Sequence, residues 1–131
     1  MTDSLTITKS EGRVKVLHLA GRLDGQTQDA LLQAAEAEHN CGARFMVLDL
    51  KDLQMITSAG LRTLHLIYQM FTPKAEIDAW EQARHGEPYK SAYFKLAAAP
   101  ANIHYVLNIA GFLNSIPAFP DLDAALKSFP A

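Results

Sequence analysis

A strand that runs directly into a helix is the feature that most constrains the fold of this chain. Phe45–Leu50 is apolar apart from Asp49, a pattern typical of a strand covered on both faces, or of one within a mixed sheet. Apolar residues then recur at helical spacing over about Ser58–Phe71, at Leu61, Leu64, Ile67, Tyr68 and Phe71. This succession predicts an α/β fold with crossover helices.

The rest of the chain repeats this alternation of short strands and helices. Alternating and apolar runs predict four further strands, at Ser4–Thr8, Val14–Ala20, Tyr93–Ala97 and Ser115–Phe119. Helical spacing and end signals predict three further helices, over about Thr27–Asn40, over Pro100–Ala110, and after a cap at Asp121. Gly21–Gly25 is expected to break the second strand. We therefore predict one α/β domain over residues 1–131, a mixed sheet of about five strands packed with about four helices in the order ββαβαβαβα.

An extra segment, Thr72–Ala92, interrupts this pattern. Ile77, Trp80 and Ala83 are spaced for a short helix that Thr72-Pro73 would start and His85-Gly86 would end. One interpretation is a surface elaboration that folds back on the core. The other is a partner-binding flap anchored by Trp80.

Composition excludes several classes of function. Apolar residues make up 49% of the chain and charged residues 20%, so a real core is expected. The net charge is −2 and no Lys/Arg cluster occurs, which argues against a nucleic-acid partner. No apolar run is long enough to insert in a membrane, and the start lacks the pattern of a signal peptide. Cys41 is the only cysteine, so we expect no internal disulfide and a cytoplasmic location.

No catalytic or metal-binding motif is evident. The five histidines are not spaced as metal ligands with one another or with Cys41. Ser58 is not in a Gly-x-Ser-x-Gly elbow, and a Gly-x-x-x-x-Gly-Lys loop is missing. We therefore expect no enzyme activity, no metal and no cofactor, although a weaker nucleotide site at the helix start stays open.

The helix start at Thr57–Gly60 is the candidate site. A helix N-terminus has unpaired N–H groups and a positive dipole end, so it tolerates a phosphate on Ser58. Gly60 and Ala59 keep the surface small, which would let a partner's backbone approach. The alternative is that Thr57 and Ser58 are ordinary N-cap residues with no regulatory role.

Five stretches in order extend this argument over nearly the whole chain. They are Gly21-Arg-Leu-Asp24, Val47-Leu-Asp-Leu50, Ile56-Thr-Ser-Ala-Gly-Leu-Arg62, Asn102–Phe112 and the tail Phe119–Leu126. Together they resemble a STAS domain of the anti-sigma-factor antagonist family. The resemblance implies partner switching, in which a serine-kinase anti-sigma factor binds the antagonist and phosphorylates it, and a serine phosphatase resets it.

The resemblance also implies roles for individual residues. Ser58 aligns with the family's phosphoacceptor, and Asp24 with the aspartate of a loop that lies near it. Thr57 stands where the family often has an acidic residue or serine, so the modified hydroxyl is Ser58 or Thr57. The partner surface is expected to include Asp24, Thr57, Ala59, Gly60 and Arg62.

Two other functions remain open. The first is a STAS subunit of a larger assembly, such as a lipid-transport ATPase complex or a stress-signalling scaffold, in which the helix start docks without being phosphorylated. The second is a sensor of a small ligand or nucleotide.

Overall fold

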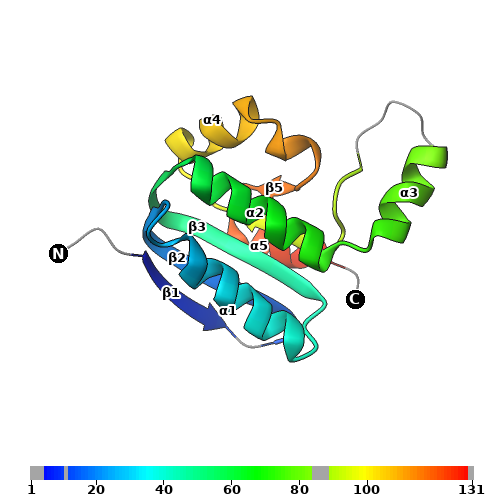
Figure 1. Cartoon of the computed structure of the whole chain (residues 1–131), viewed down its shortest axis with the longest axis horizontal. Helices are drawn as coiled ribbons and strands as arrows, with labels where there is room; N and C mark the ends of the chain where they lie inside the picture. Colours follow the sequence, from blue (N-terminus) through cyan, green and yellow to red (C-terminus); the bar gives the residue numbers. More distant parts are fainter. Residues whose placement is uncertain (1–4, 11, 84–88, 130–131) are drawn as a thin grey trace.

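The computed structural model describes residues 5–10, 12–83 and 89–129. Within them, five strands form one sheet in the order β1-β2-β3-β4-β5 (Figure 1). The strands are β1 (Leu5–Ser10), β2 (Val14–Leu23), β3 (Phe45–Ile56), β4 (Phe94–Ala97) and β5 (Ala118–Phe119). β1 is antiparallel to β2, and each later strand runs parallel to its neighbour. The predicted mixed sheet with an N-terminal hairpin is therefore confirmed.

The helices lie on both faces of this sheet. They are α1 (Gln28–Asn40), α2 (Ser58–Phe71), α3 (Lys74–Ala83), α4 (Ala101–Ile109) and α5 (Leu122–Lys127), with a short 3-10 turn at Phe112–Asn114. In Figure 1, α1 and α2 lie side by side in front of the sheet and α5 lies behind it. Asp121 caps α5 as predicted, because its side chain accepts a hydrogen bond from the Ala124 backbone N–H at 2.8 Å.

Two strands extend further than predicted. Gly21 does not break β2, which continues to Leu23, and β3 runs past Leu50 to Ile56. Gly21 has φ +116° and pairs with Leu53, and the β2–β3 register shifts on either side of it. Glycine adopts this φ without steric cost. The register shifts accommodate the local bend, so β2 continues through Gly21.

The last strand is shorter than predicted. The range Ser115–Phe119 reduces to Ala118–Phe119, because residues 112–114 form the 3-10 turn and the Ser115 N–H closes that turn on Phe112. Pro117, which has no N–H to donate, precedes the strand and accepts a hydrogen bond from Leu96 at 2.9 Å. The first strand is also shifted, to Leu5–Ser10, and Ser4 lies outside the described residues.

The larger core lies between the sheet and the helices α1, α2 and α4. It is built from the inward faces of β2 and β3, including Leu17 and Leu48, and from the apolar stripe of α2. Leu64 and Ile67 of that stripe are fully buried. The apolar side chains whose spacing predicted α2 are therefore the ones that pack this helix on the sheet.

A smaller core lies under α5 and contains a buried lysine. Val16, Val47, Ala97, Ala125 and Phe129 form its apolar part. The Lys95 ammonium donates to the Ser128 carbonyl at 3.2 Å and to its hydroxyl at 2.8 Å, and it lies 4.2 Å from the Phe129 ring centroid. Burial lowers the pKa of Lys95 below its ordinary value of 10.5.

This burial predicts a pH-dependent effect of Lys95→Met. Since the folded-state pKa is lowered, the unfolded chain holds the proton more tightly, and the wild type gains stability as pH rises from the lowered pKa toward 10.5. We expect Lys95→Met to have the higher free energy of unfolding at neutral pH, with the difference shrinking in alkali. Urea titrations at several pH values check this. A variant that is less stable than the wild type at neutral pH would contradict it.

The extra segment leaves the domain and returns to it at one point. Thr72 and Ser91 are buried, and their hydroxyls are 2.8 Å apart. The Ser91 hydroxyl also accepts hydrogen bonds from the backbone N–H groups of Tyr93 and Phe94, both at 3.1 Å. The predicted short helix is confirmed as α3, and its expected end at His85-Gly86 lies outside the described residues.

Candidate interaction site at the start of helix α2

Ser58 is the first residue of α2 and its side chain is exposed. Among the described residues its hydroxyl has no hydrogen-bond partner. Thr57 occupies the N-cap position with φ −104° and ψ 178°, but its side chain makes no capping hydrogen bond. The Thr57 hydroxyl oxygen is buried and unpaired instead. Thr57 therefore holds the N-cap position, as the capping interpretation expects, but neither hydroxyl makes the side-chain hydrogen bond of an ordinary cap.

Backbone contacts hold this helix start against the end of β2. The Thr57 N–H donates to the Leu23 carbonyl at 3.0 Å, and the Thr57 carbonyl accepts from the Leu61 N–H at 2.9 Å. The first turn of α2 carries no acidic side chain. The positive end of the helix dipole is thus positioned firmly, and no carboxylate within the first turn of α2 compensates it.

Gly60 faces the core, which corrects the expectation that it lies on the partner surface. It is buried, and a Cβ at this position would come within 2.8 Å of Leu23 Cγ, the Leu23 carbonyl oxygen and Ile56 Cγ1. The glycine is therefore needed for the close approach of α2 to the ends of β2 and β3. Ala59 is half-buried, and its expected place on the partner surface stays a prediction.

We expect Gly60→Ala to destabilise the domain. The added methyl group overpacks the contact with Leu23, at a cost of about 1–3 kcal/mol. This exceeds or offsets the gain of about 1 kcal/mol in helix propensity. The matched control is Gly25→Ala, whose Cβ would meet its nearest atom, Ala59 Cβ, at an ordinary 3.9 Å. Urea unfolding measures both, and equal stability of the two variants would contradict the packing argument.

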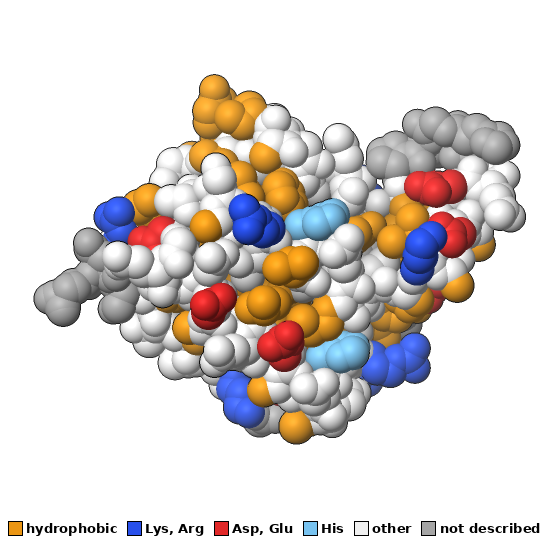
Figure 2. Space-filling model, in the orientation of Figure 1, with side chains coloured by type: hydrophobic (Ala, Val, Ile, Leu, Met, Phe, Trp, Pro, Cys, Tyr) orange, Lys and Arg blue, Asp and Glu red, His pale blue; other side chains and the backbone are white. Residues whose placement is uncertain are grey.

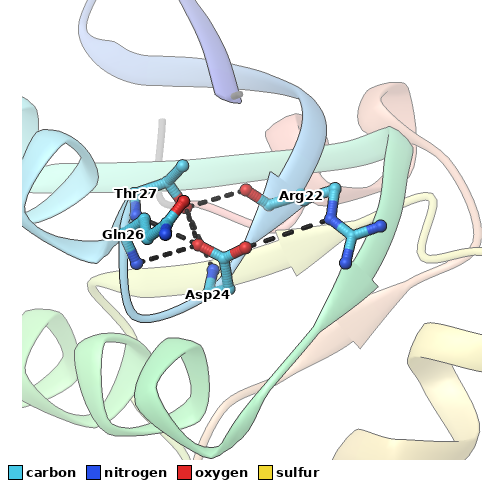
Figure 3. A network of polar contacts seen from close by, with 4 residues as sticks. All are labelled: Arg22, Asp24, Gln26 and Thr27. Carbon is cyan, nitrogen blue, oxygen red and sulfur yellow. Dashed lines mark hydrogen bonds and ion pairs between the residues drawn. The ribbon is translucent and has the colours of Figure 1, made fainter. Parts of the chain in front are cut away.

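Asp24 organises the loop that adjoins this helix start (Figure 3). Its Oδ1 accepts hydrogen bonds from the backbone N–H groups of Gln26 at 2.9 Å and Thr27 at 3.2 Å. The Thr27 hydroxyl donates to the Arg22 carbonyl at 2.8 Å and accepts from the Asp24 N–H at 3.0 Å. Asp24 thus fixes the turn between β2 and α1, while its Oδ2 faces Arg22 Nε at 3.9 Å.

The structure brings most of the predicted residues together. Asp24 is followed by Gly25, whose backbone lies close to Ala59. The Thr57 N–H is hydrogen-bonded to the carbonyl of Leu23, the residue before Asp24. Arg62 is exposed on α2, four residues after Ser58, so both lie on the same side of the helix one turn apart. Ser58 and Arg62 are the two predicted residues with exposed side chains.

Three residues that sequence reasoning did not single out lie at the same end of the molecule as the start of α2. Arg22 Nε is buried beside Asp24 and has no hydrogen-bond partner. The sequence could have pointed to Arg22, because it belongs to the Gly21–Asp24 stretch that resembles the family. Tyr105 and Ile109 of α4 are 65% and 66% exposed. They lie four residues apart on a helix whose start is tied to β3, since Asn102 Nδ2 donates to the Gln54 carbonyl at 3.1 Å. Large exposed apolar side chains commonly mark interaction surfaces.

Several other classes of site find no support in the described residues. They contain no group of three or more His, Cys, Asp or Glu side chains placed to hold a metal ion. No described helix combines the length and apolarity needed to cross a membrane. On the face that carries α1 and α2, acidic and basic side chains are interspersed and do not gather into a basic patch (Figure 2).

Comparisons with known proteins agree with this fold. The model of the STAS domain family matches residues 6–76. No curated protein matches the sequence. The chain is similar to the structure of an anti-sigma factor antagonist from Mycobacterium paratuberculosis, with 24% identity, a TM-score of 0.75, and coverage of 98% of this chain and 96% of that one.

Two further structures show the same fold in different settings. One is the Bacillus cell fate determinant SpoIIAA in its phosphorylated form, with 13% identity, a TM-score of 0.60, and coverage of 94% of this chain and 96% of that one. The other is the murine Solute Carrier 26 family member A9 anion transporter, with 14% identity and a TM-score of 0.57. That match covers 91% of this chain and 18% of the transporter. At these identities the likeness concerns the fold.

Proposed function

The chain belongs to the STAS domain family, and from this premise we propose that it is a protein-interaction module that acts as an anti-sigma-factor antagonist. Its partner in this proposal is a serine-kinase anti-sigma factor, which it binds in the cytoplasm while Ser58 is unphosphorylated. The kinase phosphorylates Ser58, the complex ends, and a serine phosphatase restores the binding form. The antagonist itself contributes no catalytic step to this cycle.

The observation that carries the proposal is the exposed, unbonded Ser58 hydroxyl at the uncapped start of α2. A kinase can reach this hydroxyl without unfolding the domain. The neighbouring Thr57 hydroxyl is buried, which favours Ser58 as the acceptor over Thr57. Structures of proteins with this fold include an antagonist by name and a phosphorylated form, which supports the proposal.

A phosphate on Ser58 would change binding more than folding. It adds a charge of about −1.5 to −2 at the positive end of the α2 dipole, an arrangement worth about 0.3–1 kcal/mol at an exposed site. Arg62, one turn along the same helix, supplies a nearby cation. A partner pressed against this spot would have to bury the dianion and would lose affinity.

Phosphosite mapping tests the proposal directly. We expect incubation with ATP and a serine kinase encoded near this gene to add one phosphate, which mass spectrometry locates on Ser58. The matched control is Ser58→Ala, which should take up no phosphate although Thr57 is intact. Phosphate on Thr57, or undiminished phosphorylation of Ser58→Ala, would overturn the assignment.

The second candidate function is a docking subunit of a larger assembly, and α3 is the observation that favours it. This helix has no buried residues, although its Ile77 packs against the larger core, and it projects from one end of the domain (Figure 1). Trp80 packs edge-to-face on Tyr89, with ring centroids 5.9 Å apart, so the projection has its own internal support. Loss of partner binding in an exposed α3 variant such as Glu81→Arg, with unchanged binding in Ser58→Ala and Ser58→Asp, would favour this function.

A further inference from the structure

A hydrogen-bonded line of serine, histidine and aspartate crosses three neighbouring strands. Ser10 Oγ lies 2.7 Å from His18 Nε2, and His18 Nδ1 lies 2.8 Å from Asp49 Oδ2. Ser10 ends β1, His18 is in β2 and Asp49 is in β3. These residues take no part in the interaction site at the start of α2.

Strand register places the three side chains on one face of the sheet. Ser10 is paired with Val16, and His18 with Asp49. Residues two apart in a strand share a face, so His18 lies on the same face as Val16, which packs in the smaller core on the α5 side. Since α5 packs on β3, β4 and β5, the Ser10 end of this face is not covered by it, and Ser10 is exposed.

The carboxylate at the end of the line sets the direction of the two hydrogen bonds. A carboxylate can only accept, so the tautomer that satisfies Asp49 carries its proton on His18 Nδ1. His18 Nε2 is then an acceptor, and the Ser10 hydroxyl donates to it. Asp49 is held in place by its other oxygen, which accepts from the Lys51 N–H at 3.1 Å, and its side chain is only 11% exposed.

We propose that Ser10 is an activated nucleophile that accepts acyl groups from small activated esters. Ser10 Oγ forms a bond to the ester carbonyl carbon while its proton moves to His18 Nε2. The bond from that carbon to the leaving oxygen then breaks, and His18 returns the proton to the departing alcohol. Water completes the cycle by the same route, with His18 as its base, and releases the acid.

Within this relay His18 and Asp49 have different roles. His18 exchanges the proton with the reacting atoms and is the general base. Asp49 reaches the reacting atoms only through His18, so it is a positioning residue that holds the tautomer and stabilises the imidazolium formed during the step. The exposed position at a sheet edge suits small electrophiles, because no helix covers β1 on this side in the described part of the chain.

Labelling with a fluorophosphonate tests the proposal without a natural substrate. Ser10 Oγ would bond to phosphorus, the P–F bond would break, fluoride would leave and His18 would take the proton. We expect one adduct, mapped to Ser10 by mass spectrometry and lost in Ser10→Ala. His18→Gln should slow labelling by about 10²–10⁴-fold, the usual contribution of a positioned base.

Three further variants separate the chemistry from effects on folding. Thr8→Ala removes an exposed hydroxyl directly opposite His18 in the β1–β2 register and should leave the labelling rate unchanged. Asp49→Asn should slow labelling, whereas Asp49→Glu, which keeps the charge, should recover part of the rate. Equal labelling of wild type and His18→Gln, or no adduct on Ser10, would mean that the three residues serve only to satisfy one another and would overturn the proposal.

Discussion

Ser58→Asp is expected to weaken binding of the serine-kinase anti-sigma factor at least about 100-fold, equivalent to about 2.8 kcal/mol. Ser58 is exposed at the start of α2, where a bound partner would cover it. A carboxylate trapped in an interface without a partner typically costs about 2–5 kcal/mol. Isothermal titration calorimetry of the wild type and the variant measures the difference.

Two matched variants isolate charge from shape in this experiment. Ser58→Asn has the size of the aspartate variant without its charge and should bind much more tightly than it does. Ser58→Ala removes the hydroxyl and should bind nearly as the wild type does. If all three variants bind alike, the charge on residue 58 does not control the complex and the proposed switch fails.

Leu64→Ala is expected to lower the free energy of unfolding by about 2–5 kcal/mol. Leu64 is 0% exposed and belongs to the larger core between α2 and the sheet. Removing its side chain loses apolar burial and leaves a cavity that neighbouring side chains fill only in part. Urea denaturation followed by circular dichroism measures the change.

The control for this substitution lies two residues along the same helix. Leu66 is 39% exposed, so Leu66→Ala should change the free energy of unfolding by no more than about 0.5 kcal/mol. Helix propensity affects both variants alike. A similar loss at both positions would mean that α2 is not packed by the face described here.

Much of the candidate site could be anticipated from the sequence. The apolar period of α2 and the strand before it placed a helix start at Thr57-Ser58, because periodicity is a local signal. The exposure of Ser58 and the proximity of the Asp24 loop then follow from a parallel arrangement of β2 and β3. The binding roles of Asp24, Thr57, Ala59 and Arg62 stay predictions.

Other features of the site could not be read from local patterns. Gly60 was expected to open the surface, but it faces Leu23, and the direction of a glycine depends on what packs against the helix. Gly21 was expected to end β2, but a register shift keeps it in the strand. Capping also failed as a guide, since Thr57 has a favoured N-cap residue type and makes no cap bond.

By itself, the sequence determined the α/β class, the order of strands and helices, and the position of Ser58 at a helix start. These follow from side-chain periods of about 2 and 3.6 residues, which each segment carries within itself. Only the tertiary structure decided the buried role of Gly60 and the line from Ser10 through His18 to Asp49. That line joins residues 8 and 31 positions apart. Its existence depends on the register between strands, which is set by packing across the whole sheet.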